Sequence, residues 1–130
     1  GDKSPDANIQ GGVEALKKFD DLEIVFVGNE EIIKQKLSSF DYDKTRVSVI
    51  NAPDEISANE QPTTAIRQKT NSSLYVGFET LRQSEDINAF VTSGSTGATL
   101  AGAVLRIGRI KGVKRPAFCP ILPTVFFFKR

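Results

Sequence analysis

The 130-residue sequence contains no histidine and a single cysteine, Cys119. Without histidine, the side chain that most often exchanges protons near neutral pH is missing, and Cys/His zinc sites are excluded. A single cysteine cannot form a disulfide within the chain, which fits a reducing compartment. Because Cys119 lies in the apolar run 117–122, we expect it to be packed in the core.

Long apolar runs are also missing, since none approaches the roughly 20 residues that cross a bilayer. The first residues show no basic stretch followed by an apolar one, so no secretory signal is expected. We expect neither a metal nor a cofactor.

Acidic residues are missing from the last third of the chain, because all 16 lie at or before Asp86. The first 86 residues carry ten basic residues, and the remaining residues carry seven. A basic end suits an anionic ligand, an acidic protein or an anionic membrane surface. The alternative is a solvated loop without a function, because charge runs are common on protein surfaces.

The apolar spacing predicts strands that alternate with helices. Strands are expected at residues 22–27, 47–50 and 87–92. Helices are expected to start near Ser4, Asn29, Pro62 and Ser72, and a last one over 98–107, before a stop at Gly108. This alternation predicts one α/β domain with a mostly parallel sheet and ligands beyond the carboxyl ends of its strands.

A glycine-rich turn, residues 93–97, joins the predicted strand 87–92 to the last predicted helix. Such a junction directs backbone N–H groups and the positive end of a helix dipole at an anion, most often a phosphate. We expect positive φ at the two glycines and hydroxyl donors from the other three residues. The candidate phosphate ligands are Ser93, Gly94, Ser95, Thr96 and Gly97.

The turn belongs to neither common nucleotide-binding motif. No lysine follows Gly97, which excludes a Walker A loop, and the spacing does not fit GxGxxG. The alternative interpretation is a tight turn with a helix cap and no ligand.

Three further residues are candidates for phosphate binding. Lys3 would pair with a phosphate and Asp2 would orient it, unless this segment is only an N-terminal cap. Arg67 and Lys69 are two positions apart and diverge on a helix, so we expect only one of them, Arg67, to face a ligand.

A series of short motifs in one order gives the chain a family resemblance. They are GDKSP at 1–5, VGNE at 27–30, NAPDEI at 51–56, PTTAIR at 62–67, NSSL at 71–74, FVTSGSTGA at 90–98, GRIKGVKRPA at 108–117 and LPT at 122–124. In this order the chain resembles the amino-terminal part of bacterial phosphate acyltransferases, the fatty acid/phospholipid synthesis proteins. The resemblance covers residues 1–124, a partial α/β domain, and 125–130 form a tail that does not match.

The resemblance implies transfer of an acyl chain from acyl carrier protein to inorganic phosphate, which gives acyl phosphate for phospholipid synthesis. It also implies a Rossmann-like three-layer α/β/α fold, here truncated at both ends. The whole protein would be a cytoplasmic homodimer that contacts the membrane peripherally and binds no nucleic acid. Because acyl carrier protein is acidic, the candidates for docking it are basic: Arg106, Arg109, Lys111, Lys114 and Arg115.

Two functions follow as alternatives, beside the possibility of an assembly or aggregation-prone fragment with no ligand. The chain is either part of such an acyltransferase, not competent by itself, or a non-catalytic phosphate- or nucleotide-binding α/β module. Titration with phosphate, acyl phosphate and nucleotides would separate the two.

Overall fold

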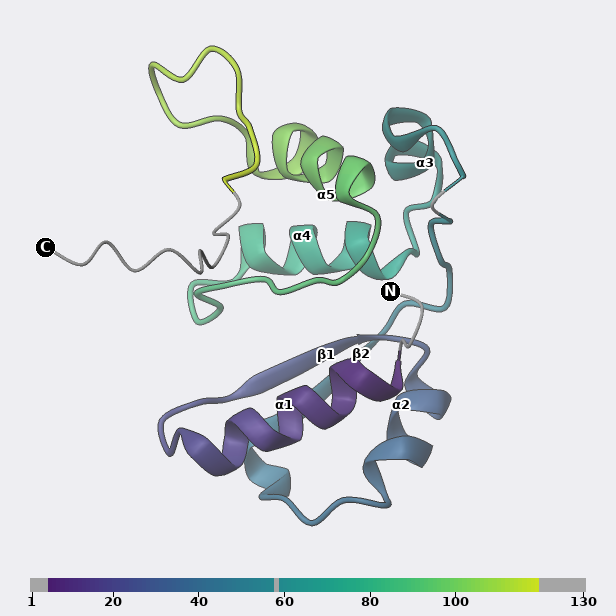
Figure 1. The fold of residues 1–130 in the computed structure, drawn as a ribbon, viewed down its shortest axis with the longest axis vertical. Helices are drawn as coiled ribbons and strands as arrows, with labels where there is room; N and C mark the ends of the chain where they lie inside the picture. Colours follow the sequence, from purple (N-terminus) through teal and green to yellow (C-terminus); the bar gives the residue numbers. More distant parts are fainter. Residues whose placement is uncertain (1–4, 58, 120–130) are drawn as a thin grey trace, which may run out of the picture.

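The structure is a computed structural model that describes residues 5–57 and 59–119 (Figure 1). These residues form five α-helices, two strands, a short 3-10 helix η1 and a single π-helical turn η2. In chain order the elements are α1 (Asp6–Lys18), β1 (Ile24–Gly28), α2 (Glu30–Leu37), η1 (Lys44–Arg46), β2 (Val47–Asn51), α3 (Pro62–Gln68), α4 (Ser73–Gln83), α5 (Thr96–Gly102) and η2 (Ala103–Ile107).

The two strands are parallel neighbours, as the alternation of strands and helices predicts. Their register places Ile24 beside Val47 and Gly28 beside Asn51. The backbone N–H of Ala52 donates to the carbonyl of Gly28 over 2.7 Å and extends the pairing past the end of β2. Both strands end on the same side of the molecule, where α2 begins (Figure 1).

The third predicted strand, 87–92, is not a strand in the structure. The segment is extended but has no ladder partner among the described residues. Phe90 is instead held by α4, with its ring centroid 4.9 Å from that of Phe78. An apolar run can favour an extended backbone, whereas a strand also needs a neighbour for its N–H and C=O groups. The described residues thus form a small α/β unit, and the three-layer arrangement stays an expectation for the whole protein.

Two apolar clusters stabilise this unit. In the first, α1 and α2 cover one face of the sheet with Ile9, Val13, Ile33 and Leu37. In the second, α3, α4 and α5 pack around Ile66, Leu74, Phe78 and Ala98. In Figure 1 the first group forms the purple and blue half of the molecule, and the second forms the teal and green half.

Arg46, at the end of η1, closes the C-terminal end of α1. Its Nη2 donates to the carbonyl of Leu16 over 3.0 Å, and its Nη1 donates to three further carbonyls, those of Phe19, Asp20 and Leu22. A helix leaves its last carbonyls without partners inside the helix. The guanidinium therefore fixes the turn that leads from α1 into β1.

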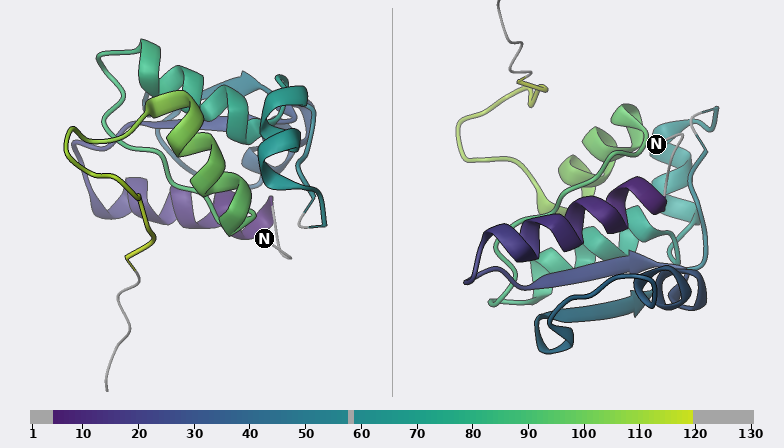
Figure 2. Two further views of the ribbon diagram at one scale, coloured as in Figure 1. Left: turned by 90° about the horizontal axis from the view of Figure 1, so that it is seen from above. Right: turned by 60° about the horizontal axis from the view of Figure 1, so that its bottom comes forward.

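The last predicted helix is present, although it starts at Thr96 and ends in the π-helical turn η2. Gly108 stops it with φ = 95°, as its position predicts. From Gly108 to Cys119 every residue is exposed, and this segment runs outside the packed helices (Figure 2). The prediction of a buried Cys119 is therefore wrong, because the segment that carries it packs on neither apolar cluster.

The helices of the described ranges were searched for membrane spans. None of them is long and apolar enough to cross a bilayer.

Candidate functional site

At the start of α5, the glycine turn has three backbone N–H groups with no partner among the described residues. Ser95 is the N-cap, and its hydroxyl oxygen accepts from the N–H of Ala98 at 3.4 Å. The N–H of Gly94 donates to the hydroxyl of Thr92 at 3.1 Å. The residues between Gly94 and Ala98 are Ser95, Thr96 and Gly97, and their N–H groups donate to no other described residue. These three adjacent N–H groups can donate to an anion without breaking an existing hydrogen bond.

The glycines of the turn have a different role from the one predicted. Neither has a positive φ, since the described part of the chain shows that conformation only at Gly108 and Gly112. A Cβ on Gly97 would instead lie 2.9 Å from Cγ of Pro62. Gly97 is therefore a place of close approach between α5 and α3.

The turn lies where several helices begin. In Figure 1, the first residues of α1, α4 and α5 are on the side where β1 and β2 end, and α3 stands beside them. Across this side, Ser93 Oγ donates to Oδ1 of Asn8 in α1 over 2.9 Å. Ligands of parallel α/β proteins bind at this end of the strands.

The start of α2, at the same end of the sheet, is already occupied by side chains. Asn29 caps it as predicted, with Oδ1 accepting from the N–H of Ile32 at 3.1 Å. Oδ1 of Asn51 accepts from the N–H of Glu30 at 3.2 Å. This helix start therefore has fewer unused N–H groups than the start of α5.

Among the remaining phosphate candidates, only Arg67 lies in the part of the chain that the structure describes. Asp2 and Lys3 lie outside the described residues. Arg67 is exposed on α3 and makes no hydrogen bond or ion pair with the residues that the structure describes. It follows Ile66, which contacts α5, so it projects about 100° around the helix from that contact.

Arg106 differs from the other docking candidates because its charge is already paired. Its Nε and Nη2 lie 2.6 and 2.5 Å from Oε1 of Glu79, and its guanidinium lies 4.5 Å from the ring centre of Tyr75. Arg82 binds the other oxygen of Glu79 at 2.8 Å. These bonds, that of Arg82 first, hold the pKa of Glu79 below its usual value. Arg106 thus fastens η2 to α4.

The other four basic candidates share one exposed loop after Gly108. Arg109 closes this loop by donating from Nη1 to the carbonyl of Lys114 over 2.9 Å, and Ile110 lies near its tip, 81% exposed. The four are Arg109, Lys111, Lys114 and Arg115, and we call this segment, 109–115, the basic loop.

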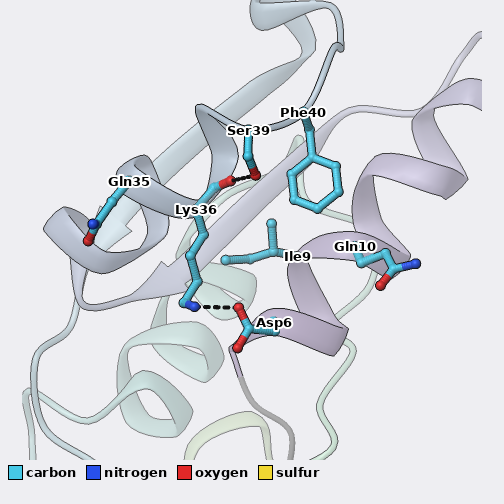
Figure 3. A pocket seen from close by; sticks show the side chains of 7 residues that line it. All are labelled: Asp6, Ile9, Gln10, Gln35, Lys36, Ser39 and Phe40. Carbon is cyan, nitrogen blue, oxygen red and sulfur yellow. Dashed lines mark hydrogen bonds and ion pairs between the residues drawn. The ribbon is translucent and has the colours of Figure 1, made fainter.

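A hollow of about 390 Å³ lies between α1 and α2, where the sequence predicts no site (Figure 3). Ile9 and Phe40 line its apolar part, and an ion pair between Lys36 and Asp6 crosses its mouth. Because this ion pair satisfies the charged groups of the hollow, we assign it no ligand.

Sequence reasoning missed the contacts of Asn8 and of Glu79. The first joins residues 85 positions apart, and the second joins residues 27 positions apart. Helical spacing places both residues on their helices but does not say which loop or helix lies opposite them.

The comparisons with known proteins agree with one another. The chain matches the model of a family described as "Fatty acid synthesis protein" over residues 1–128. This match extends beyond Thr124, where the motifs end. The described residues stop at 119. The predicted boundary between a domain at 1–124 and a tail at 125–130 therefore stays a prediction.

Three curated relatives show the extent of the similarity. A phosphate acyltransferase of Clostridium novyi is 43% identical over 123 residues, 95% of this chain and 37% of the relative. One of Thermoanaerobacter pseudethanolicus is 45% identical over 96% of this chain and 36% of the relative. A putative phosphate acyltransferase of Clostridium perfringens strain 13 is 46% identical over 95% of this chain and 36% of the relative. The chain thus spans a little over a third of the length of these relatives.

Proposed function

Because the chain belongs to the fatty acid synthesis protein family, we propose that it is part of an acyltransferase that moves a fatty acyl group from acyl carrier protein to inorganic phosphate. The product would be acyl phosphate for phospholipid synthesis. The relatives' name, phosphate acyltransferase, supports an acyl transfer that involves phosphate. The observation that carries the proposal to this chain is the set of open N–H groups at Ser95, Thr96 and Gly97.

In this proposal the glycine turn, Ser93 to Gly97, holds the phosphate. Phosphate is already an anionic nucleophile, so the reaction needs no strong base, which agrees with a sequence without histidine. A phosphate oxygen attacks the thioester carbonyl carbon, the new C–O bond forms, and the C–S bond breaks. The carrier's thiolate leaves and takes a proton from water. The site then contributes by holding the nucleophile beside the carbonyl and by stabilising negative charge.

The basic loop would receive the acyl carrier protein in this scheme. Its four cations have no acidic residue near them in the sequence, and they are exposed. Such a surface attracts an acidic partner and speeds its approach. Arg106 would support the loop from η2 rather than touch the partner, because its guanidinium is paired with Glu79.

For the whole protein we propose the Rossmann-like three-layer fold, a cytoplasmic homodimer and peripheral contact with the membrane. The parallel pairing of β1 and β2 supports the fold, because parallel sheets are covered by helices on both faces. Asp2, Lys3 and Arg67 remain proposed as additional phosphate ligands. The absence of a nucleotide motif at the glycine turn agrees with phosphate itself as the ligand.

The proposal is tested by acyl phosphate formation from an acyl carrier protein thioester and inorganic phosphate. The assay would use this chain and a chimera in which it replaces the matching segment of the Clostridium novyi relative. We expect the chimera to form acyl phosphate and to lose this activity when Gly94→Val crowds the turn. A chimera that folds but forms no acyl phosphate, while this chain binds nucleotides in preference to phosphate, would establish the non-catalytic module instead.

The docking part has its own test. Lys111→Glu with Lys114→Glu is expected to weaken binding of acyl carrier protein at least tenfold at low salt, because two attractive charges become repulsive. The matched control is Lys17→Glu with Lys18→Glu, which makes the same change of charge on α1. Equal losses in the two double variants would show that net charge, and not the basic loop, governs binding.

A further inference from the structure

The basic loop carries its cations around one exposed apolar side chain. Ile110 is 81% exposed, and among the large apolar side chains that the structure describes only Val91, at 92%, is more exposed. Arg109 and Lys111 flank Ile110 in the sequence, and the other two cations follow in the same loop. None of the four makes an ion pair with a described residue. An apolar centre with a charged rim is the composition of a contact surface.

Two hydrogen bonds give this loop a fixed shape. The backbone N–H of Val113 donates to the carbonyl of Ile110 over 3.0 Å, and Gly112 between them has φ = 92°. This arrangement fits a type II turn, which needs a positive φ at its third residue. The bond from Arg109 to the carbonyl of Lys114 closes the same loop over 2.9 Å. Ile110 is therefore held at the start of a formed turn, which lowers the conformational entropy lost when a partner binds.

The charge of the loop decides between possible partners. Ile110 and Val113 belong to neither apolar cluster, so the shape of the loop does not serve the core. No acidic residue follows Asp86 in the sequence. Two copies of the loop would repel each other, whereas an acidic protein surface would be attracted. The loop thus fits an acidic partner better than a second copy of itself.

We propose that Ile110 is the apolar anchor by which the basic loop holds acyl carrier protein, and this rests on the docking role proposed above. Ile110 enters an apolar depression of the carrier, and the cations around it pair with acidic residues at the rim of that depression. Burial of the anchor slows dissociation, while the charges speed association. The turn at Gly112 keeps the anchor in position.

The experiment measures binding rates of this chain on immobilised, acylated acyl carrier protein of Clostridium novyi. We expect Ile110→Ser to weaken binding roughly five- to thirtyfold, the range of a truncated interface anchor, mainly through faster dissociation. Val91→Ser is the matched control, since it removes an equally exposed apolar side chain outside the loop. It should leave binding unchanged.

Salt separates the anchor from the charges around it. The factor lost by Ile110→Ser should be the same at low and moderate salt. The factor lost by Lys111→Glu with Lys114→Glu should shrink as salt rises, because exposed charges are screened. If the Ile110→Ser loss also disappears with salt, the side chain acts only through its charged neighbours and is not an anchor.

Gly112→Ala tests the shape of the loop. It keeps all four cations and Ile110, and its Cβ meets nothing within 4 Å, but its positive φ strains any L side chain. We expect weaker carrier binding with an unchanged melting temperature, because the loop packs on neither cluster. Gly11→Ala, which also has open space around its Cβ, should bind the carrier normally. Equal binding by both glycine variants would show that a formed turn is not needed.

The outcomes separate the anchor from the function on which it rests. If the unaltered chain binds the carrier and Ile110→Ser binds as well as Val91→Ser, only the anchor is wrong. If the unaltered chain does not bind the carrier although the chimera forms acyl phosphate, the docking role and the anchor are wrong and the acyltransferase stands. An Ile110→Ser loss confined to anionic phospholipid vesicles, with carrier binding intact, would assign the side chain to a membrane and overturn this proposal.

Discussion

Single residues decide how the ends of α1 and α5 are finished. At the C-terminal end of α1, the guanidinium of Arg46 gathers carbonyl groups from the last helical turn and the loop that follows. Only 23% of this side chain is exposed. The planar fork of arginine reaches several acceptors at once, which an ammonium group cannot do in the same geometry.

We therefore expect Arg46→Lys to lower the free energy of unfolding by about 1–3 kcal/mol, because partly buried carbonyls lose their donors. Urea denaturation followed by circular dichroism would measure this change. Lys44→Ala in the same short helix is the control, since Lys44 is exposed and should change stability little. A loss of the same size in both variants would argue against the capping role of Arg46.

Glu79 gives a second residue-scale prediction, which concerns pH. Its bonds to Arg82 and Arg106 hold its pKa below the usual value. A carboxylate with a lowered folded-state pKa stabilises the fold above its unfolded pKa, and the contribution is lost as pH falls through the folded pKa. The stability difference between the unaltered chain and Glu79→Gln should be constant near neutral pH and shrink below about pH 4.5.

Melting temperatures of the two proteins between pH 3 and pH 7 would test this. Asp43 and Glu60 also have lowered pKa values, from hydrogen bonds with Thr45 and Lys69 respectively, but they are present in both proteins. Their effects therefore cancel in the difference. A difference that does not change with pH would mean that the Glu79 pairs do not contribute to stability.

At the scale of elements, glycine sets how closely the helices pack. A Cβ on Gly102 of α5 would lie 2.5 Å from Cε2 of the buried Phe78. We expect Gly102→Ala to cost about 1–3 kcal/mol of stability, because the ring is confined and an added methyl must displace it. The measurement is again urea denaturation.

Gly11→Ala is the matched control for this substitution. Gly11 is also inside a helix, but nothing lies within 4 Å of its added Cβ. It should stabilise the chain by up to about 1 kcal/mol, since alanine favours helix more than glycine does. Opposite signs for the two glycines would confirm that contact, and not helix propensity, governs Gly102.

The sequence predicts those elements whose signals are local. The helix after Asn29 follows from a capping side chain and apolar residues at helical spacing, and α2 is found there. The extended segment before the glycine turn could not be predicted in full, because pairing depends on a partner strand that the segment itself does not encode. The candidate phosphate turn was found for the same local reasons, whereas its contact with Asn8 depends on the tertiary fold.

At the scale of the whole molecule, the described residues form two apolar clusters with no residue in common. Ile66→Ala should cost about 2–5 kcal/mol, as for other buried large-to-small changes. Because Ile66 belongs to the second cluster, we expect amide hydrogen exchange to speed up more in α4 and α5 than in α1 and β1. Ile9→Ala, in the first cluster, should show the reverse pattern. Uniform acceleration in both variants would show one cooperative unit.

The parallel register of β1 and β2 has a consequence for the time course of folding. Pairing β1 with β2 closes a loop that contains the whole of α2 and η1. Unlike the strands of a hairpin, these strands cannot begin to pair next to a tight turn. The conformational entropy of the loop is therefore lost before the first hydrogen bond between the strands forms. The helix that Asn29 initiates shortens this loop beforehand, so mutations that weaken α2 should slow the collapse of the sheet more than they speed its opening.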